Sequence, residues 1–350
     1  MKKVLLIRLS SLGDVIFNVP LANELKSNGY EVTWIVSEKG IDIVKNNPAV
    51  DNAILIPLKK WKKNRFSLNN VLEFFSILRK LRAEKFDIAI DTQMMLKTAI
   101  WMFLCGAKRK LGYSVGREYS TLAVKEKINK PQTSDYQIHA VYQHLQFAKY
   151  LGLTDEVKFT LPASASDVIK KADKLLKDVD KYKPMVVISP ATTWKLKHWN
   201  KDNWKVVVNA IKDKCSLVFT GMECDRELIS YIGGDEHINL VGKTNIKDMI
   251  EIFSRADIVM APDSGSSHVA RATEKPAVIT IFCCTPPKMY GPFGDDKKYF
   301  AINGKLSCQP CHTRICPLSG KAAEQCVNHP KPEEIINIVN MLLQNSEHSV

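Results

Sequence analysis

Residues 3–17 read KVLLIRLSSLGDVIF, and this stretch predicts a β-strand that runs through a tight turn into a helix. The run from Lys3 to Leu9, apolar apart from Lys3 and Arg8, is typical of a strand buried on both faces. After Gly13 the apolar side chains recur at near-helical spacing. Further short, β-rich runs lie at 31–36, 52–56 and 86–91. Because helical or loop-like sequence separates these runs, the pattern predicts a parallel sheet with crossover helices.

A second alternating series follows a polar, lysine-rich stretch at 163–184, which suits a connecting helix and a linker between domains. Its candidate strands are 185–188, 217–220, 238–241, 257–260 and 277–282. We therefore expect an α/β fold with two Rossmann-like domains, 1–170 and 171–350. The broad apolar stripe at 333–344 predicts a terminal helix, which would pack within the second domain or back on the first.

The composition is that of an ordinary globular chain, with 350 residues of which 45% are hydrophobic and 25% charged. It excludes a disordered, collagenous or disulfide-scaffold protein. No uncharged apolar run reaches the roughly 18 residues of a membrane-spanning helix. The first apolar run also meets Arg8 too early for a signal peptide. We therefore expect the protein to stay in the cytoplasm.

The net charge of +13 attracts polyanions such as nucleic acid, anionic lipid headgroups or phosphorylated substrates. The densest basic segment runs from Lys59 to Arg65 and places five cations around Trp61. A second cluster lies at Lys108–Lys110. A solvated, lysine-rich face would give the same pattern, so charge alone does not select the partner.

The first strand-to-helix turn, Arg8–Asp14, lacks the three glycines of a dinucleotide-binding G-x-G-x-x-G motif. This absence argues against an NAD-dependent oxidoreductase. The turn instead offers two serine hydroxyls, one glycine and the Asp14 carboxylate at the start of a helix. Asp14 would either accept a proton from a substrate hydroxyl or cap that helix.

Two turns of the second half suit anionic ligands. Residues 189–199 supply Thr192, Thr193 and Lys197, which would contact a diphosphate or form a polar loop anchored by tryptophans. Residues 261–270 are small residues that lead from a strand into a helix. Free backbone N–H groups at such a helix start make an anion site, so this turn favours phosphate binding most strongly.

Together, Ser10–Asp14, the basic segment 59–62 and the motifs at 191–199 and 263–268 resemble the glycosyltransferase family of the lipopolysaccharide heptosyltransferases (glycosyltransferase family 9). The resemblance covers about residues 1–300, and the order and spacing of the motifs match the heptosyltransferase I branch best. It implies a GT-B fold, with two Rossmann-like domains facing each other across a cleft. It also implies inverting transfer of L-glycero-D-manno-heptose from ADP-heptose to a Kdo residue of lipid A, in inner-core lipopolysaccharide synthesis.

The resemblance assigns roles to individual residues, with Asp14 as the general base. The implied donor-binding residues are Thr192, Thr193, Lys197, Asp225 (or Glu223), Thr244 with Asn245, Asp263, Ser264, Gly265 and His268. The implied acceptor-binding residues are Arg8, Ser10, Ser11, Gly13, Lys59, Lys60, Lys62 and Arg117. Catalysis would require no cofactor and no metal, because hydroxyls, a lysine and backbone amides would stabilise the departing ADP.

Both implied substrates are anionic, so the positive net charge of the chain would attract them. The basic segment would face the carboxylates and phosphates of the acceptor, and Trp61 suits an amphipathic surface that touches lipid headgroups. We therefore expect peripheral attachment to the cytoplasmic face of the inner membrane.

Nine cysteines fall into two groups. Five are scattered and are most simply buried thiols. The other four are Cys308, Cys311, Cys316 and Cys326, whose first pair has the C-x2-C spacing of a metal chelate. This cluster predicts a structural zinc or iron site, free thiols or disulfides.

Two other hypotheses use some of the same features. The charge and the cysteine cluster would suit a basic, metal-stapled nucleic-acid-binding protein, but that hypothesis leaves the three strand-end turns unexplained. The second is a heptosyltransferase with another acceptor, either a heptose of the core or a protein. We expect ADP-heptose and Kdo-lipid A as partners, and no nucleic acid.

Overall fold

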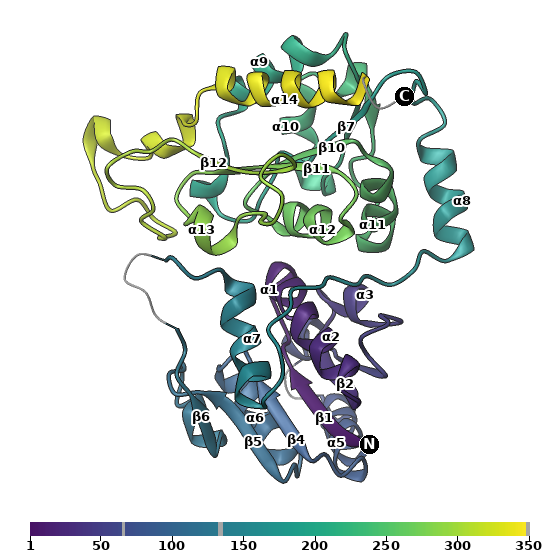
Figure 1. Cartoon of the computed structure of the whole chain (residues 1–350), viewed down its shortest axis with the longest axis vertical. Helices are drawn as coiled ribbons and strands as arrows, with labels where there is room; N and C mark the ends of the chain where they lie inside the picture. The colour runs from purple at the N-terminus through teal and green to yellow at the C-terminus, as the bar shows by residue number, and fades with distance from the viewer. Residues whose placement is uncertain (65–66, 132–135, 348–350) are drawn as a thin grey trace. The chain divides into compact units, whose positions relative to one another are not determined.

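The computed structural model describes residues 1–64, 67–131 and 136–347. The chain divides into two compact units, Met1–Ala163 and Ser164–Val350, and each unit contains one six-stranded sheet (Figure 1). The domain boundary expected between residues 170 and 171 falls inside helix α8 (Ser166–Leu175). Among the described residues, no helix combines the length and the apolar character needed to cross a membrane.

The first sheet has the order β3-β2-β1-β4-β5-β6, and every strand pair is parallel. Its strands are β1 (Lys2–Ile7), β2 (Tyr30–Ser37), β3 (Asn52–Ile56), β4 (Ile88–Asp91), β5 (Arg109–Tyr113) and β6 (Glu126–Ile128). The helices of this unit are α1 (Leu12–Phe17), α2 (Val19–Ser27), α3 (Ile41–Val44), α4 (Leu58–Lys63), α5 (Leu68–Ala83), α6 (Leu96–Leu104), the 3-10 helix η1 (Ser120–Ala123) and α7 (Ala140–Tyr150). Strand β1 lies in the middle of this sheet, and its residues Val4–Ile7 are fully buried.

The second sheet is also entirely parallel, with the order β12-β11-β10-β7-β8-β9. Its strands are β7 (Met185–Ile188), β8 (Ser216–Phe219), β9 (Ile238–Asn239), β10 (Ile258–Pro262), β11 (Ala277–Phe282) and β12 (Tyr299–Asn303). Besides α8, its α-helices are α9 (Lys201–Ile211), α10 (Arg226–Tyr231), α11 (Ile246–Arg255), α12 (Gly265–Thr273), α13 (Pro287–Tyr290) and α14 (Pro332–Glu347). Short 3-10 helices lie at Lys195–Lys197, Glu223–Asp225, Gly234–Glu236, Gly320–Ala322 and Gln325–Asn328.

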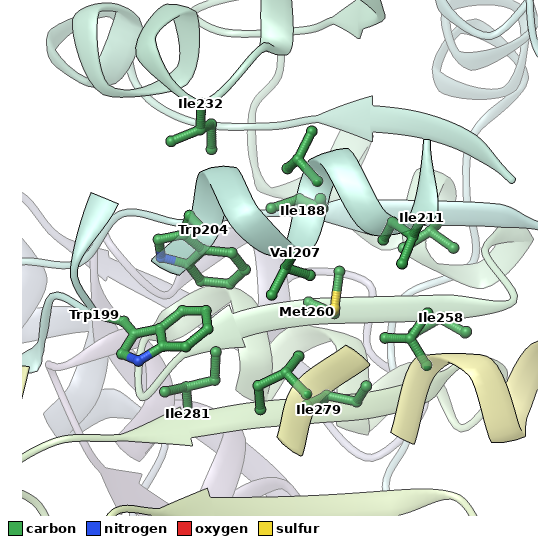
Figure 2. Packing of buried hydrophobic residues seen from close by; sticks show 14 of the residues in the cluster. Ile188, Trp199, Trp204, Val207, Ile211, Ile232, Ile258, Met260, Ile279 and Ile281 are labelled. Carbon is green, nitrogen blue, oxygen red and sulfur yellow. The ribbon is translucent and has the colours of Figure 1, made fainter. Parts of the chain in front are cut away.

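The core of the second unit packs helices α9 and α14 against the apolar face of the sheet. Trp204 of α9 is fully buried beside Ile188 and Met260, and Trp199 meets it edge to face at 5.1 Å between ring centroids (Figure 2). Ile335 and Val339 of α14 are fully buried in the same core. The expected terminal helix therefore packs on α9, within its own unit.

Three strands were missing from the sequence prediction, namely β5, β6 and β12. Strand β5 has the sequence RKLGY and β6 has EKI, so charged side chains hide the apolar periodicity of strands near a sheet edge. Strand β12 is an edge strand of the second sheet, and its residues are only half-buried. The strands with continuous apolar sequence were predicted correctly, including 185–188 and 277–282 to the residue.

Candidate functional site

The strand order reverses once in each sheet, between β1 and β4 in the first and between β7 and β10 in the second. Connections leave such neighbouring strands in opposite directions, so a crevice opens beyond their carboxyl ends, and ligands bind there in open α/β sheets. The turns singled out in the sequence, Arg8–Asp14, 189–199 and 261–270, follow β1, β7 and β10. Each unit therefore has one candidate site at its reversal point.

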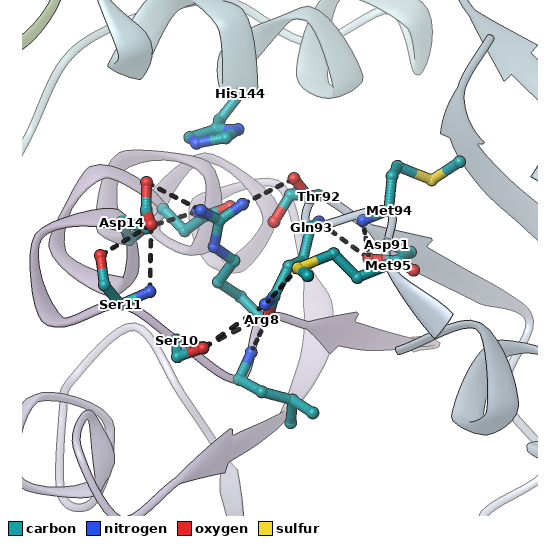
Figure 3. A network of polar contacts seen from close by, with 12 residues as sticks. Arg8, Ser10, Ser11, Asp14, Asp91, Thr92, Gln93, Met94, Met95 and His144 are labelled. Atoms are coloured by element: carbon teal, nitrogen blue, oxygen red, sulfur yellow. Dashed lines mark hydrogen bonds and ion pairs between the residues drawn. The ribbon is translucent and has the colours of Figure 1, made fainter. Parts of the chain in front are cut away.

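In the first unit, the Asp14 carboxylate is held on both oxygens (Figure 3). Its Oδ1 lies 2.8 Å from Nη2 of Arg8, while Oδ2 accepts hydrogen bonds from the amide and the hydroxyl of Ser11, at 3.0 and 2.8 Å. Ser11 is the N-cap residue of α1, so Asp14 caps the start of its own helix. The side chain nevertheless remains 31% exposed, which leaves room for a ligand hydroxyl.

The charge state of Asp14 is set by its cation. Burial tends to raise the pKa of this carboxyl, but Arg8 and the two hydrogen bonds from Ser11 outweigh burial and hold the pKa well below its usual range. Arg8 is buried and also donates to the carbonyl oxygen of Thr92, 2.7 Å away, beyond the end of β4. One guanidinium thus joins the two strand ends of the reversal point and keeps Asp14 ionised.

Two further polar residues reach the turn from the β4 side. The amide oxygen of Gln93 accepts from the backbone N–H groups of Leu9 and Ser10, at 2.9 and 3.3 Å. The ammonium of Lys97, on α6, donates to the Ser10 hydroxyl at 2.7 Å. Burial and the neighbouring Arg8 lower the pKa of Lys97. Neither residue was singled out from the sequence, although both follow a predicted strand whose end shares this sheet edge.

A buried pair from β5 and α7 completes the surroundings of Arg8. The Tyr113 hydroxyl donates to the carbonyl oxygen of Gln143 at 2.9 Å and lies 3.0 Å from Nδ1 of His144. Burial raises the pKa of Tyr113, while burial and the nearby Arg8 cation lower the pKa of His144. His144 faces the Arg8–Asp14 pair in Figure 3. These residues could not be recognised from the sequence, because strand β5 was not predicted.

The remaining acceptor candidates are more dispersed. Gly13 is buried within α1, and Arg117 is exposed. In α4, Lys59 and Lys62 are exposed, while Lys60 pairs with Glu73 at 3.0 Å. Arg65 lies outside the described residues.

Trp61 was expected on an amphipathic surface that touches lipid headgroups, but its ring packs against neighbouring helices. Its ring stacks on Trp101 with 6.2 Å between centroids, and its Nε1 donates to Glu73 at 2.8 Å. The ring also meets Phe74 edge on. Trp61 is therefore a half-buried packing residue that fastens α4 to α5 and α6.

In the second unit, the buried carboxylate of Asp263 gathers three side chains. Its Oδ2 lies 2.6 Å from Nζ of Lys197 and accepts from the Thr285 hydroxyl at 2.6 Å, while Oδ1 lies 3.4 Å from Nε2 of His268. Burial tends to raise the pKa of Asp263, but His268 and Lys197 outweigh it and hold the pKa well below its usual range. A buried anion thus fixes two potentially cationic groups beside the start of α12.

The start of α12 has the features of an anion site. Ser264 is its N-cap residue, and the buried Ser264 hydroxyl oxygen has no hydrogen-bond partner among the described residues. Thr192 donates to the carbonyl oxygen of Asp263 at 3.3 Å, whereas Thr193 is exposed. Free N–H groups at a helix N-terminus and the nearby Lys197 favour a phosphate group here. The structure therefore brings together five predicted donor residues, namely Thr192, Lys197, Asp263, Ser264 and His268.

An aromatic platform beside this cluster was not predicted. The Lys197 ammonium lies 4.8 Å from the ring centroid of Trp194, and the Arg314 guanidinium lies at the same distance from that ring. His312 stacks on Trp194 with 6.3 Å between centroids. Lys197 thus makes a cation–π contact with Trp194 in addition to its ion pair with Asp263.

The other predicted donor-binding residues, Asp225 (or Glu223) and Thr244 with Asn245, follow strands β8 and β9 of the same sheet. Asp225, after β8, is the N-cap residue of α10 and accepts from the amide of Met222 at 2.8 Å. Glu223 instead pairs with Arg226 at 2.7 Å. Thr244, after β9, is half-buried and directly precedes Asn245, the N-cap residue of α11.

The four clustered cysteines, Cys308, Cys311, Cys316 and Cys326, line one small cavity of about 10 Å³. All nine cysteines are free, so no disulfide forms in this structure. Burial and, to a smaller extent, the other three thiols of the cluster raise the pKa of Cys326 to about 11. Within the described ranges, no three His, Cys, Asp or Glu side chains are arranged to hold a metal ion. Of the five scattered cysteines, Cys224 is exposed, contrary to expectation, and the other four are buried.

Comparison with known proteins agrees with this geometry. The model of glycosyltransferase family 9 (heptosyltransferase) matches residues 74–322. The chain is 26% identical to lipopolysaccharide heptosyltransferase 1 of Pseudomonas aeruginosa, over 90% of this chain and 87% of the relative. The glycosyltransferase family 9 structure from Veillonella parvula has a TM-score of 0.78 at 17% identity, covering 98% of this chain and 97% of that chain. Escherichia coli heptosyltransferase WaaC with ADP has a TM-score of 0.68 at 24% identity, covering 83% and 91%. The expected α/β, GT-B fold class is confirmed.

Replacing Arg8 by Gln tests the control of Asp14. Without the cation, burial dominates, and we expect the titration midpoint of Asp14 to rise by about one pH unit or more. The folded-state pKa of Asp14 is depressed, so the ion pair stabilises the fold above the unfolded value of about 3.9 and this contribution is lost as the pH falls below it. Carboxyl ¹³C NMR between pH 2 and 7 measures the midpoint.

Asp51, paired with Lys26 at 2.5 Å, serves as an internal control whose midpoint stays unchanged in the Arg8→Gln variant. An Asp14 midpoint that is equal in the wild type and the variant would show that Arg8 does not set its charge state.

Proposed function

The chain belongs to glycosyltransferase family 9, the heptosyltransferase family, and from this premise we propose the reaction and the roles of its residues. It is a glycosyltransferase of lipopolysaccharide core synthesis. We propose that it transfers L-glycero-D-manno-heptose from ADP-heptose to a Kdo residue of lipid A, with inversion at the anomeric carbon. The similarity to heptosyltransferase 1 of P. aeruginosa supports the first-heptose assignment.

The observation that carries this proposal is the ionised, partly exposed Asp14 at the reversal point of the first sheet. A hydroxyl of the acceptor donates a hydrogen bond to this carboxylate. As the hydroxyl oxygen bonds to the anomeric carbon, its proton passes to Asp14, and the bond between that carbon and the ADP oxygen breaks with its electron pair. A single carboxylate suffices for this inverting transfer, because the leaving group needs no protonation.

The departing diphosphate gains negative charge, and the second unit supplies groups to stabilise it. Lys197, Thr192 and the N–H groups at the start of α12 converge beyond the ends of β7 and β10. Asp263 positions Lys197 and His268 so that little reorganisation is needed when the charge develops. The ADP in the related WaaC structure supports an adenosine diphosphate donor. In this proposal no metal takes part in the transfer.

The low pKa of Asp14 makes it a weak base before the reaction. The acceptor hydroxyl becomes acidic enough to give its proton to Asp14 only as its oxygen loses electron density to the sugar. Proton transfer therefore accompanies bond formation. The same low pKa keeps Asp14 ionised in mildly acidic medium. Because the acceptor is a lipid, we also propose that the protein works peripherally on the cytoplasmic face of the inner membrane.

For the cysteine cluster we propose a structural zinc or iron ion. Four thiols that line one small cavity are the donor set that these metals favour. A metal would lower the raised pKa of Cys326 and draw the four sulfurs into coordination distance. Such an ion would cross-link the segment 308–326 and would not contact the transferred sugar.

Replacing Asp14 by Asn removes the proton acceptor while keeping the shape of the side chain. We expect turnover on deacylated Kdo-lipid A to fall by about 10²–10⁴-fold. Isothermal titration should show ADP-heptose binding within about twofold of the wild type. Full activity in Asp14→Asn would remove Asp14 as the base; donor binding without turnover by the wild type would point to another acceptor.

The pair Lys197 and Lys195 tests the diphosphate site with a matched control. Lys197→Met removes the cation beside α12, so we expect ADP affinity to fall about tenfold or more. Lys195 is exposed and pairs with Glu324 at 2.9 Å, so Lys195→Met should bind ADP like the wild type. Equal affinities of the two variants would contradict the assignment, and thermal melts verify that both variants fold.

Metal analysis of the purified protein tests the cysteine cluster. We expect about one zinc or iron per chain in the wild type, and loss of that metal together with a lower melting temperature in Cys308→Ser. Cys224→Ser, at an exposed cysteine outside the cluster, should keep the metal. A metal-free wild type with four thiols titratable by a thiol reagent would establish free cysteines instead.

A further inference from the structure

The positive charge of the chain is concentrated in one part of the first unit. Residues 58–130 contain seventeen Lys and Arg against six Asp and Glu, which is a net charge of +11 out of the +13 of the whole chain. The segment begins with the four lysines of α4 and includes α5, α6 and η1. Within it, α4, α5, α6 and η1 themselves hold eight Lys and Arg against one Glu, a net charge of +7, so a surface built from them is strongly attractive to anions.

The same segment exposes apolar side chains in a regular pattern. On α5, Leu68, Val71, Leu72 and Phe75 are 71%, 43%, 59% and 58% exposed. Their spacing of i, i+3, i+4 and i+7 places them on one face of the helix. Leu78 and Leu81, further along the helix, are buried, so another face of α5 packs inward. Helix α5 is thus apolar on both its core side and its solvent side.

Helix α6 repeats this arrangement. Leu96, Ile100 and Phe103 are 54%, 41% and 67% exposed, at positions i, i+4 and i+7. On the other side of the helix, Trp101 is buried against Phe74 of α5, with 4.9 Å between ring centroids. The 3-10 helix η1 packs on α6 and adds Leu122, which is 79% exposed.

An aromatic cluster fixes these helices relative to one another. Trp61 of α4, Phe74 of α5 and Trp101 of α6 are in mutual ring contact. The rings occupy the inner sides of the helices, so the exposed stripes of α5 and α6 are left to the solvent beside the lysines of α4. Lys110 borders the stripe of α6, with its ammonium 5.5 Å from the ring centroid of Phe103. The charge of Glu73 on α5 is compensated by Lys60, and the same carboxylate accepts a hydrogen bond from Trp61.

We propose that the exposed faces of α5 and α6, with the lysines of α4, form a membrane-docking surface for an anionic bilayer. Apolar side chains enter the boundary between headgroups and acyl chains while the lysines bind anionic headgroups. A second copy of the chain does not fit, because it would bring the same positive charge against this surface. Six of the eight exposed apolar side chains are aliphatic, whereas single-stranded nucleic-acid binders rely on aromatic side chains on which the bases stack.

The inference rests on the proposed function in one respect, namely that the acceptor is a lipid. The docking surface adjoins the candidate site through α6, since Leu96 is exposed in the stripe and the next residue, Lys97, donates to Ser10 of the site. A lipid headgroup beside the N-terminus of α6 would therefore lie next to the turn that holds Asp14.

Vesicle co-sedimentation tests the surface without donor or acceptor. The full-length wild type should bind phosphatidylcholine vesicles containing 30% phosphatidylglycerol, and this binding should weaken as salt is added. Val71→Glu and the double variant Leu72→Glu, Phe75→Glu should reduce the partition coefficient at least tenfold. Val206→Glu is the matched control, because Val206 of α9 is 45% exposed on a helix of the other unit. Circular dichroism melts confirm that the variants fold.

The outcomes separate the docking surface from the proposed function. Loss of vesicle binding in the α5 variants, with wild-type turnover on soluble, deacylated acceptor, supports the surface. Equal vesicle binding by Val71→Glu and Val206→Glu, or dimerisation of the wild type that the α5 variants abolish, overturns it. Absence of heptose transfer by a wild type that binds vesicles through α5 would refute the proposed function and leave the surface standing.

Discussion

The buried guanidinium of Arg8 is the interaction on which the first unit's site depends. A buried cation is costly unless it is paired, and Arg8 is paired with the Asp14 carboxylate and the Thr92 carbonyl. These two contacts come from opposite sides of the reversal point in the sheet. Arg8 also adds to the effect of burial in lowering the pKa of His144 and of Lys97, so its charge acts on more of the site than Asp14.

Each unit has a buried charged residue at its reversal point, and the two residues carry opposite charges. In the first, a buried cation holds a partly exposed anion, Asp14; in the second, a buried anion, Asp263, holds Lys197 and His268. Both arrangements lie at the reversal point of their sheet, where the connections that follow two neighbouring parallel strands run in opposite directions. The transfer proposed for this protein requires one group that accepts a proton and another that stabilises the negative charge of the leaving group.

Sequence was informative where chemistry and local pattern coincide. Continuous apolar runs predicted the central strands, and unusual polar residues in the turns after them indicated Asp14, Thr192, Lys197 and Asp263. Gln93, Lys97 and His144 could not be predicted in this way, because their proximity to Asp14 depends on strand order and on the unrecognised strand β5. Trp61 was misjudged because a tryptophan among lysines gives the same local pattern whether its ring faces lipid or packs on Phe74 and Trp101.

The hydrogen bond from Lys97 to Ser10 makes α6 a member of two structures at once. Its polar contacts belong to the turn that carries Asp14, and its exposed stripe belongs to the solvent side of the unit. Thermodynamic linkage between two such sites is reciprocal. If membrane binding at the exposed stripe changes the affinity of the turn for its ligand by some factor, ligand binding at the turn changes the membrane affinity of the stripe by the same factor.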